Sequence, residues 1–352
     1  VSKIHGRVSR EMFQQMWPGY FAEENHIGYV TNGVHLPTWA DASWQKLYKE
    51  VLGENYIDVQ SDLNVWSKIE NVADETIWNI KKELKHKLTE YLKVKVVEDM
   101  QRRQESPSLI INTIENFNEN ALIIGFARRF ATYKRAHLLF NNIERLAELL
   151  NNPEKPVVFL FAGKAHPNDK AGQDLIKMII ETSRRKEFAG KVIFLNNYDM
   201  ELGKILTSSV DIWMNTPTRP LEASGTSGEK AVMNGTLNLS VLDGWWAEGY
   251  REKAGWALQE ERTYSDQRYQ DELDAETIYN LIENEIVSLY FDRNEKGVPT
   301  RWVQYVKNDL MQIAPNYTMK RMLDDYYNQY YNKLIERTDF MRENRYEKAF
   351  EI

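Results

Sequence analysis

Between residues 121 and 245, short apolar segments alternate with stretches of helical periodicity. This alternation is typical of a parallel β-sheet with helices on both faces, because parallel strands need crossover connections. We predict five buried strands, at Ala121–Phe126, Val157–Phe161, Val192–Leu195, Val210–Met214 and Leu237–Val241. We predict helices between them at Arg135–Leu150, Gly172–Arg185 and Met200–Ser209. The expected fold class is α/β, with a Rossmann-like parallel sheet flanked by helices.

Helical patterns also lie on either side of this alternating region. From Asp74 to Gln104, apolar residues recur every three or four positions, which predicts one long helix. The chain as a whole, 1–352, is expected to form a single domain. We divide it into a mainly helical entry region (1–120), an α/β core (121–316) and a terminal helix (317–352) that packs on a partner surface.

The composition limits the partners and cofactors of the chain. Lys and Arg number 45 and Asp and Glu 52, and the net charge of −7 disfavours nucleic acid or an anionic membrane as the main partner. No apolar run approaches the ~18 residues that a membrane span requires. The absence of cysteine excludes disulfides, thiolate metal sites and cysteine nucleophiles. The 6 histidines include no pair at metal-ligand spacing, so we predict no catalytic metal.

A cluster of cations follows the first predicted strand. Arg128, Arg129, Lys134 and Arg135 lie close together at a predicted strand-to-helix turn. In parallel sheets, ligands bind beyond the carboxyl ends of the strands. Cations normally avoid a helix amino terminus, whose partial positive charge repels them, and a bound anion would relieve that repulsion. We therefore predict that this turn binds phosphate.

A turn rich in small residues follows the fourth predicted strand, between Pro220 and Lys230. Small residues let backbone N–H groups approach an anion, and we expect a helix to begin there and to carry Lys230. The glycine spacing fits neither a Walker loop nor a nucleophile elbow. From these residues alone, a site for phosphate or sugar hydroxyls and a purely structural turn both remain open.

Taken together, the motifs of the chain resemble those of the bacterial-type glycogen/α-glucan phosphorylase family, and they occur in the same order. The resemblance is to the carboxyl-terminal half of these enzymes, which contains the pyridoxal phosphate lysine. The resemblance extends over most of the chain. The segments that carry it are Val1–His5, Thr31–Trp39, Arg129–Arg135, Gly163–Ala165, Lys191–Tyr198, Glu222–Lys230, Met233–Gly235 and Asp243–Gly244.

The resemblance implies the carboxyl-terminal domain of a two-domain glycosyltransferase type B fold, with the active site in the cleft between the domains. It implies reversible phosphorolysis of α-1,4-glucan (glycogen or maltodextrin) ends to glucose 1-phosphate. The partners would be the glucan, inorganic phosphate, glucose 1-phosphate and the amino-terminal half of the parent enzyme, with a homo-oligomer left open. Because Val1–His5 lacks an initiator Met and signal-peptide features, we expect a fragment of a longer cytoplasmic enzyme, inactive by itself.

The same resemblance implies the cofactor and the site residues. Lys230 would form a Schiff base with pyridoxal 5′-phosphate, whose phosphate acts as a proton relay in the family. The catalytic residues would be Lys230, Arg129 and Lys134. The cofactor would be bound by Lys230, Arg128, Lys134, Trp39, Tyr198, Thr226 and Ser227. The sugar would be bound by Asn32, Tyr133, Glu222, Ala223, Ser224 and Gly225.

Three residues depart from the pattern of the family. Glu229 stands directly before the lysine, where we expect it to face solvent, and Asp199 follows Tyr198, where one cofactor contact is expected to be lost. His35 is left without a role. Two alternative functions remain: a nucleotide-sugar glycosyltransferase of the glycogen or starch synthase type, and a non-catalytic carbohydrate-binding module.

Overall fold

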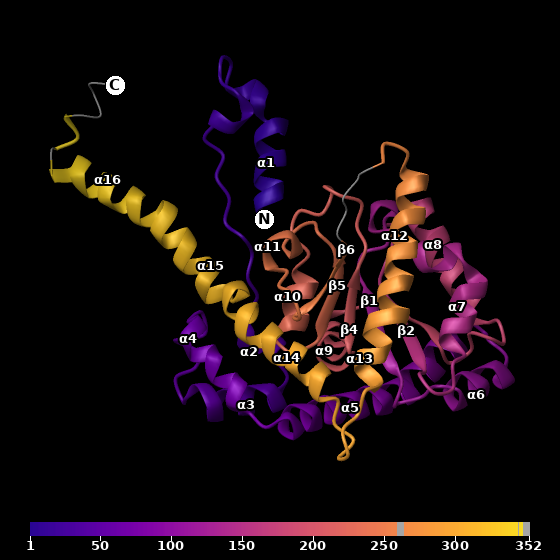
Figure 1. The fold of residues 1–352 in the computed structure, drawn as a ribbon. Coiled ribbons are helices and arrows are strands. Elements are labelled where there is room, and N and C mark those ends of the chain that lie inside the picture. Colours follow the sequence, from indigo (N-terminus) through magenta and orange to yellow (C-terminus); the bar gives the residue numbers. More distant parts are fainter. Residues whose placement is uncertain (259–263, 344, 348–352) are drawn as a thin grey trace.

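The computed structural model describes residues 1–258, 264–343 and 345–347. Within them, six strands form one sheet in the order β3-β2-β1-β4-β5-β6, and each strand runs parallel to its neighbours (Figure 1). The strands are β1 (Leu122–Ala127), β2 (Val157–Ala162), β3 (Val192–Leu195), β4 (Ile212–Asn215), β5 (Leu237–Val241) and β6 (Gly255–Leu258). The sheet confirms the predicted α/β, Rossmann-like class.

Helices precede, separate and follow the strands. Before β1 lie α1 (Lys3–Met12), α2 (Leu36–Trp39), α3 (Ala42–Leu52), α4 (Leu63–Trp66), α5 (Asp74–Arg102) and α6 (Pro107–Glu115). Between β1 and β6 lie α7 (Ile143–Leu150), α8 (Lys170–Ser183), α9 (Met200–Ser209), α10 (Thr226–Val232) and α11 (Trp246–Gly249). After β6 come α12 (Gln267–Leu281), α13 (Val287–Phe291), α14 (Thr300–Gln312), α15 (Met319–Tyr326) and α16 (Asn332–Glu343).

Successive strands are added on one side of β1 up to β3 and on its other side from β4 onward, so the order of the strands in the sheet reverses between β1 and β4. Such a switch point leaves a crevice at the carboxyl ends of the two central strands, where ligands bind in open parallel sheets. The loops that follow β1 and β4 therefore border the expected position of a functional site.

Both faces of the sheet are buried, which explains why its strands read as continuous apolar runs. Leu122, Ile124 and Phe126 of β1 belong to one apolar cluster, whereas Ile123 and Ala127 belong to another. Helices α5, α6 and α9 contribute to the second cluster, and α7, α8, α12 and α14 contribute to the first. Figure 1 shows α5 crossing below the sheet and α12 lying in front of it.

All five predicted strands are present, with small differences at their ends. β4 begins at Ile212 and not at Val210, because Val210 caps the end of α9. β6 lies outside the predicted strands, since its 4 residues are too few to display a period. The long predicted helix is α5, and the predicted Met200–Ser209 helix coincides with α9.

The predicted helix Arg135–Leu150 is wrong over its first half. Thr132–Lys134 form a single 3₁₀ turn, and Arg135 has a left-handed φ of 51°, so the α-helix α7 starts only at Ile143. The buried Arg135 guanidinium donates from Nε to the Thr216 carbonyl (2.8 Å) and pairs with Asp274 (2.6 Å). These contacts hold the backbone out of the helix, and the helix-dipole argument for a bound anion does not apply here.

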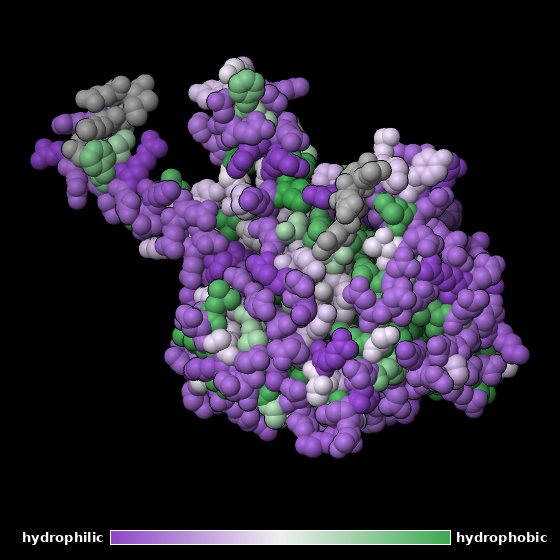
Figure 2. All heavy atoms as spheres, in the orientation of Figure 1, coloured by the Kyte–Doolittle hydropathy of each residue, from purple (hydrophilic) through white to green (hydrophobic). Residues whose placement is uncertain are grey.

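The carboxyl-terminal segment leaves the sheet behind. Figure 1 shows α15 and α16 extending away from the rest of the molecule, and none of their described residues is buried. The packing of this segment on a partner surface therefore stays a prediction. Figure 2 shows hydrophilic residues over most of the visible face, and no described helix combines the length and apolar character that crossing a membrane requires.

Two lysines of α5 tie this helix to the amino ends of the central strands. Lys85 pairs with Asp211 at 2.5 Å, contacts the Tyr290 hydroxyl and donates to the Ala121 carbonyl (2.8 Å). Asp211 also accepts from the backbone N–H of Ile123 (2.9 Å). Lys81 is equally buried and donates to carbonyls next to β4, and burial lowers its pKa to about 8. The end of the sheet opposite the crevice is thus held by buried charge.

Replacing Lys85 with Met should leave the buried Asp211 carboxylate without its cation. Such uncompensated buried charges cost about 3–5 kcal/mol of stability, so urea denaturation should show a loss of this size. The matched control is Lys82→Met on the same helix, because Lys82 is exposed and its removal should cost less than about 0.5 kcal/mol. Equal losses for the two variants would contradict the structural role of the Lys85–Asp211 pair.

Candidate active site

The loops that follow β1 and β4 meet through a buried group of three charges. Glu222, after β4, pairs with Arg128 at 2.6 Å and with Lys134. The three side chains are 7–11 % exposed. Burial alone would raise the pKa of Glu222, but the two cations outweigh it and hold that pKa below its usual range. An ionised carboxylate between two cations therefore lies at the switch point.

Arg128 has unused hydrogen-bonding capacity at this position. Its Nη2 donates to Glu222, whereas its Nε and Nη1 are buried and have no hydrogen-bond partner among the described residues. Burial lowers the pKa of Arg128, and Glu222 opposes that change. Leaving charged donors unpaired in a buried place is unfavourable, so this guanidinium is suited to a further acceptor such as a phosphate.

Lys230 emerges from the first turns of α10 and faces an aromatic ring. Its Nζ lies 3.8 Å from the ring centre of Trp39, at the end of α2. The buried Asn234 joins these two elements, because its side-chain amide donates to the carbonyls of Trp39 (2.8 Å) and Lys230 (3.0 Å) and its oxygen accepts from the Asp41 N–H (2.7 Å). Burial lowers the pKa of the Lys230 amine, and Glu229 acts in the opposite direction.

The predicted sugar-binding loop is fixed by contacts with the beginning of the chain. Asn32 donates from Nδ2 to the Ser224 hydroxyl (2.9 Å), and the Ser2 N–H donates to the Ala223 carbonyl (2.8 Å). Gly225 has a left-handed φ of 90°, which side chains rarely adopt, and it forms the N-cap of α10. The structure therefore brings Asn32 and the Glu222–Gly225 segment together, although about 190 residues separate them in sequence.

The other predicted site residues lie around this group with different degrees of contact. Arg129 is exposed, and its Nη2 lies 3.5 Å from the Tyr133 hydroxyl. Tyr198 is half-buried; burial raises its pKa, and the nearby charge of Arg128 opposes the shift. Thr226 begins α10, and the Ser227 hydroxyl accepts from the Trp213 indole (3.1 Å), so the Ser227 side chain already has a packing contact.

The two departures beside these residues have structural explanations of different kinds. Asp199 is the N-cap of α9 and accepts from the Leu202 N–H (2.9 Å), so its carboxylate serves the helix. Glu229 does not face solvent, contrary to our expectation, because it is 0 % exposed. The helix turns it toward the first residues of the chain and α15, whose positions no local sequence pattern reveals. Asn234 was also given no role by the sequence, although it lies in one of the resembling segments.

Comparison with known proteins agrees with this geometry. A family model described as carbohydrate phosphorylase matches residues 1–255. The chain belongs to this family. It is 42 % identical to a glycogen phosphorylase of Aquifex aeolicus, over 96 % of this chain and 48 % of that protein. It is 39 % identical to a maltodextrin phosphorylase of Thermococcus litoralis, over 100 % of this chain and 41 % of that protein.

A glycogen phosphorylase of Mycobacterium tuberculosis is 38 % identical over 94 % of this chain and 38 % of that protein. The chain thus spans about half the length of the curated relatives it matches, or less. Membership of the carbohydrate phosphorylase family confirms the resemblance on which the site residues were predicted. The roles of the individual residues remain predictions.

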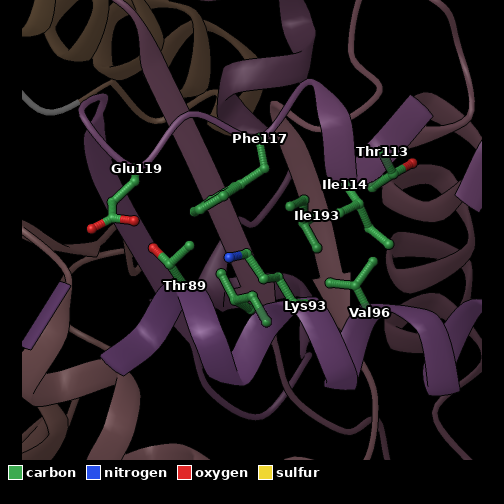
Figure 3. A pocket seen from close by; sticks show the side chains of 9 residues that line it. Thr89, Lys93, Val96, Thr113, Ile114, Phe117, Glu119 and Ile193 are labelled. Carbon is green, nitrogen blue, oxygen red and sulfur yellow. The ribbon is translucent and has the colours of Figure 1, made fainter. Parts of the chain in front are cut away.

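A separate apolar pocket of about 190 Å³ lies on the α5 side of this phosphorylase domain. Figure 3 shows Thr89, Lys93 and Val96 of α5 facing Phe117 and Ile193 across it, with Glu119 at one edge. None of the residues predicted to bind cofactor or sugar lines it. The charged groups predicted to bind phosphate converge at the switch point and not in this pocket.

Replacing Asn234 with Ala should loosen the Trp39–Lys230 arrangement. Three hydrogen bonds are lost, each with a net contribution of about 0.5–1.5 kcal/mol, so urea denaturation should show a total loss of about 1.5–4.5 kcal/mol. Asn328→Ala serves as the control, because Asn328 is exposed in the carboxyl-terminal segment. A loss no larger than that of the control would show that Asn234 does not hold the two elements together.

Proposed function

We propose that this chain carries the cofactor-bearing catalytic site of an α-glucan phosphorylase, acting on glycogen or maltodextrin. In the reaction, an oxygen of inorganic phosphate bonds to C1 of the terminal glucose as the C1–O4′ bond breaks, and the departing O4′ takes a proton. Glucose 1-phosphate and a shortened glucan result. The observation that carries the proposal is the amine of the half-buried Lys230 over Trp39, at the same sheet edge as Arg128, Lys134 and Glu222.

Pyridoxal 5′-phosphate fits the residues at this site. Two unpartnered donors of the buried Arg128, with Lys134 beside them, suit the phosphate of the cofactor. Lys230 offers an amine whose pKa is lowered by burial, as attack on an aldehyde requires, and Trp39 offers a flat apolar surface. Tyr198, Thr226 and Ser227 would complete the pocket. When bound, the cofactor supplies a phosphate group that relays a proton beside the substrate phosphate.

The remaining charges suit the second phosphate and the sugar. Arg129 is exposed next to Arg128 and Lys134, so it can reach inorganic phosphate and stabilise the negative charge that develops there. Glu222, Asn32 and Ser224 offer hydrogen-bonding groups, and backbone groups of Ala223 and Gly225 lie beside them, as glucose hydroxyls need. Tyr133, which contacts both Arg129 and Lys134, would border the sugar and phosphate positions.

A nucleotide-sugar glycosyltransferase or a carbohydrate-binding module would not need the Lys230 amine or its place over Trp39. We also propose, as the family resemblance implies, an amino-terminal half as the partner that forms the second wall of the cleft. A reaction of this type needs sugar and phosphate held in fixed orientation and shielded from water, which one wall alone provides poorly. We therefore expect the 352-residue chain to bind cofactor without turning over glucan.

The first test of the proposed function is cofactor attachment. The chain incubated with pyridoxal phosphate should gain the absorbance of the bound cofactor, and borohydride reduction should fix it to Lys230, as peptide mass spectrometry can show. Lys230→Ala should abolish the attachment, whereas Lys204→Ala, which removes a half-buried lysine of α9, should leave it unchanged. Attachment at another lysine, or none with saturating cofactor, would refute the proposed role of Lys230.

The second test concerns inorganic phosphate. In the chain loaded with pyridoxal phosphate, Arg129→Ala should weaken phosphate binding about 10- to 100-fold, since hydrogen bonds to charged groups contribute about 1.5–3 kcal/mol. Titration calorimetry measures the affinity. Arg185→Ala is the control, because Arg185 is an exposed arginine that pairs with Glu187 outside the site. An unchanged affinity in Arg129→Ala would remove Arg129 from the phosphate site.

A further inference from the structure

Glu229 is a buried acid to which the proposed function gives no role. It lies in α10 immediately before Lys230 and is 0 % exposed. Neither of its carboxyl oxygens has a hydrogen-bond partner of ordinary geometry among the described residues, and the nearby Ser224 hydroxyl has only a minor lowering effect on the pKa of this acid. An ionised carboxylate in such surroundings is strongly unfavourable unless a cation pairs with it, and no such ion pair is formed within the described part of the chain.

The charged groups near Glu229 are engaged elsewhere. They are Lys230 of α10, Arg321 of α15 and the Val1 amino group, and the Tyr317 hydroxyl also lies near. Glu248 of α11 lies near the Val1 amino group and Tyr317. The Arg321 guanidinium donates to the Thr31 (2.8 Å) and Asn32 (2.7 Å) carbonyls and to Asp325 (2.9 Å). The Val1 amino group donates to the Val30 carbonyl (3.0 Å) and to Asn32 Oδ1 (3.2 Å).

Because Arg321 and the Val1 amino group have other partners, burial dominates the proton affinity of Glu229. Burial raises the pKa of this carboxyl group to about 8, and Arg321, the Val1 amino group, Lys230 and Ser224 oppose the shift only in part. The group therefore keeps its proton at neutral pH. The same burial, with the opposite sign for a cation, lowers the pKa of the neighbouring Lys230 amine.

The charge of Glu229 bears directly on what Lys230 can do. An anion one residue away favours the charged ammonium form of Lys230, whereas a neutral acid does not. Only the uncharged amine has a lone pair for the new C–N bond to an aldehyde carbon. In that reaction the two amine hydrogens and the aldehyde oxygen leave together as water, so a charged lysine must first release a proton to solvent.

We propose that Glu229 is a positioning residue that remains a neutral carboxylic acid at neutral pH and thereby leaves the Lys230 amine free to lose its proton. The consequence for cofactor uptake rests on the proposed function. The charge relation between the two side chains does not, and it can be measured in the chain alone.

The reactivity of Lys230 tests this relation. Trace labelling with acetic anhydride, followed by peptide mass spectrometry, reports the uncharged fraction of each lysine as a function of pH. Below a pH of about 8, Lys230 should label equally in the wild type and in Glu229→Gln. Above it, ionised Glu229 should reduce wild-type labelling by roughly two- to tenfold relative to the variant, the effect of up to one pKa unit.

The control is Glu201→Gln, which neutralises an exposed glutamate of α9 and should reproduce the wild-type profile. Two results would overturn the proposal. Identical Lys230 profiles in wild type and Glu229→Gln would show that Glu229 does not act on the amine. Higher labelling of the variant already well below pH 8 would show that Glu229 is ionised at neutral pH.

Thermal unfolding gives an independent readout that does not involve Lys230. The pKa of Glu229 is about 8 in the folded chain against an ordinary value of 4.5, so its contribution to stability is present below the lower value. That contribution is lost as the pH rises toward the higher value. Between pH 4.5 and about 8, the wild-type Tm should therefore fall relative to the Tm of Glu229→Gln. Above about pH 8, the difference between the two Tm values should stay constant.

Glu229→Met gives the same comparison if the amide variant does not fold, since an apolar side chain of similar length suits a dry position. A Tm difference that is constant across the whole interval would overturn the proposal. Cofactor attachment distinguishes a failure of the proposed function from a failure of the proposed role of Glu229. If pyridoxal phosphate does not attach but the labelling difference is found, the proposed function fails and the role of Glu229 holds; the reverse pattern refutes Glu229 alone.

Discussion

The ion group formed by Arg128, Glu222 and Lys134 connects the two loops on which the proposed site depends. Arg128 and Lys134 follow β1, and Glu222 follows β4, the two strands between which the sheet changes direction. The fold supplies the crevice there, because loops diverge on either side of a switch point. The buried charges then hold the diverging loops together. Truncating Glu222 would leave both cations as unpaired buried charges, which costs more stability than the ion pairs themselves contribute.

The sequence predicted the sheet well because its strands are buried on both faces. Residues such as Phe159 and Trp213 are buried on opposite faces, so strands read as unbroken apolar runs that local inspection can find. The start of the helix after β1 could not be found in this way. The left-handed Arg135 is held by the carbonyl of Thr216 and the carboxylate of Asp274, which lie 81 and 139 residues further along the chain. A helical pattern in the sequence carries no information about such distant partners.

The site was predictable in part for a similar reason. The residues proposed to bind phosphate and sugar follow strand ends, where parallel sheets place ligands. The family resemblance supplied Asn32 and Trp39 from the distant amino-terminal segment. The sequence could not reveal which polar side chains are buried away from solvent. The burial of Glu229 depends on the segment after Val1 and on Arg321, which packing alone brings together.

Two glutamates of one short segment thus reach opposite charge states. Glu222 is held ionised because two cations face it directly. Glu229 is held neutral by burial, since Arg321 and the Val1 amino group near it are bonded to other groups. Neither state follows from residue type, since both side chains have the same ordinary pKa. Environments that shift the pKa values of two like groups in opposite directions are typical of functional sites, where each group must hold a particular charge. In this chain, ionised Glu222 pairs with the two cations of the proposed phosphate site, and neutral Glu229 places no negative charge beside the Lys230 amine.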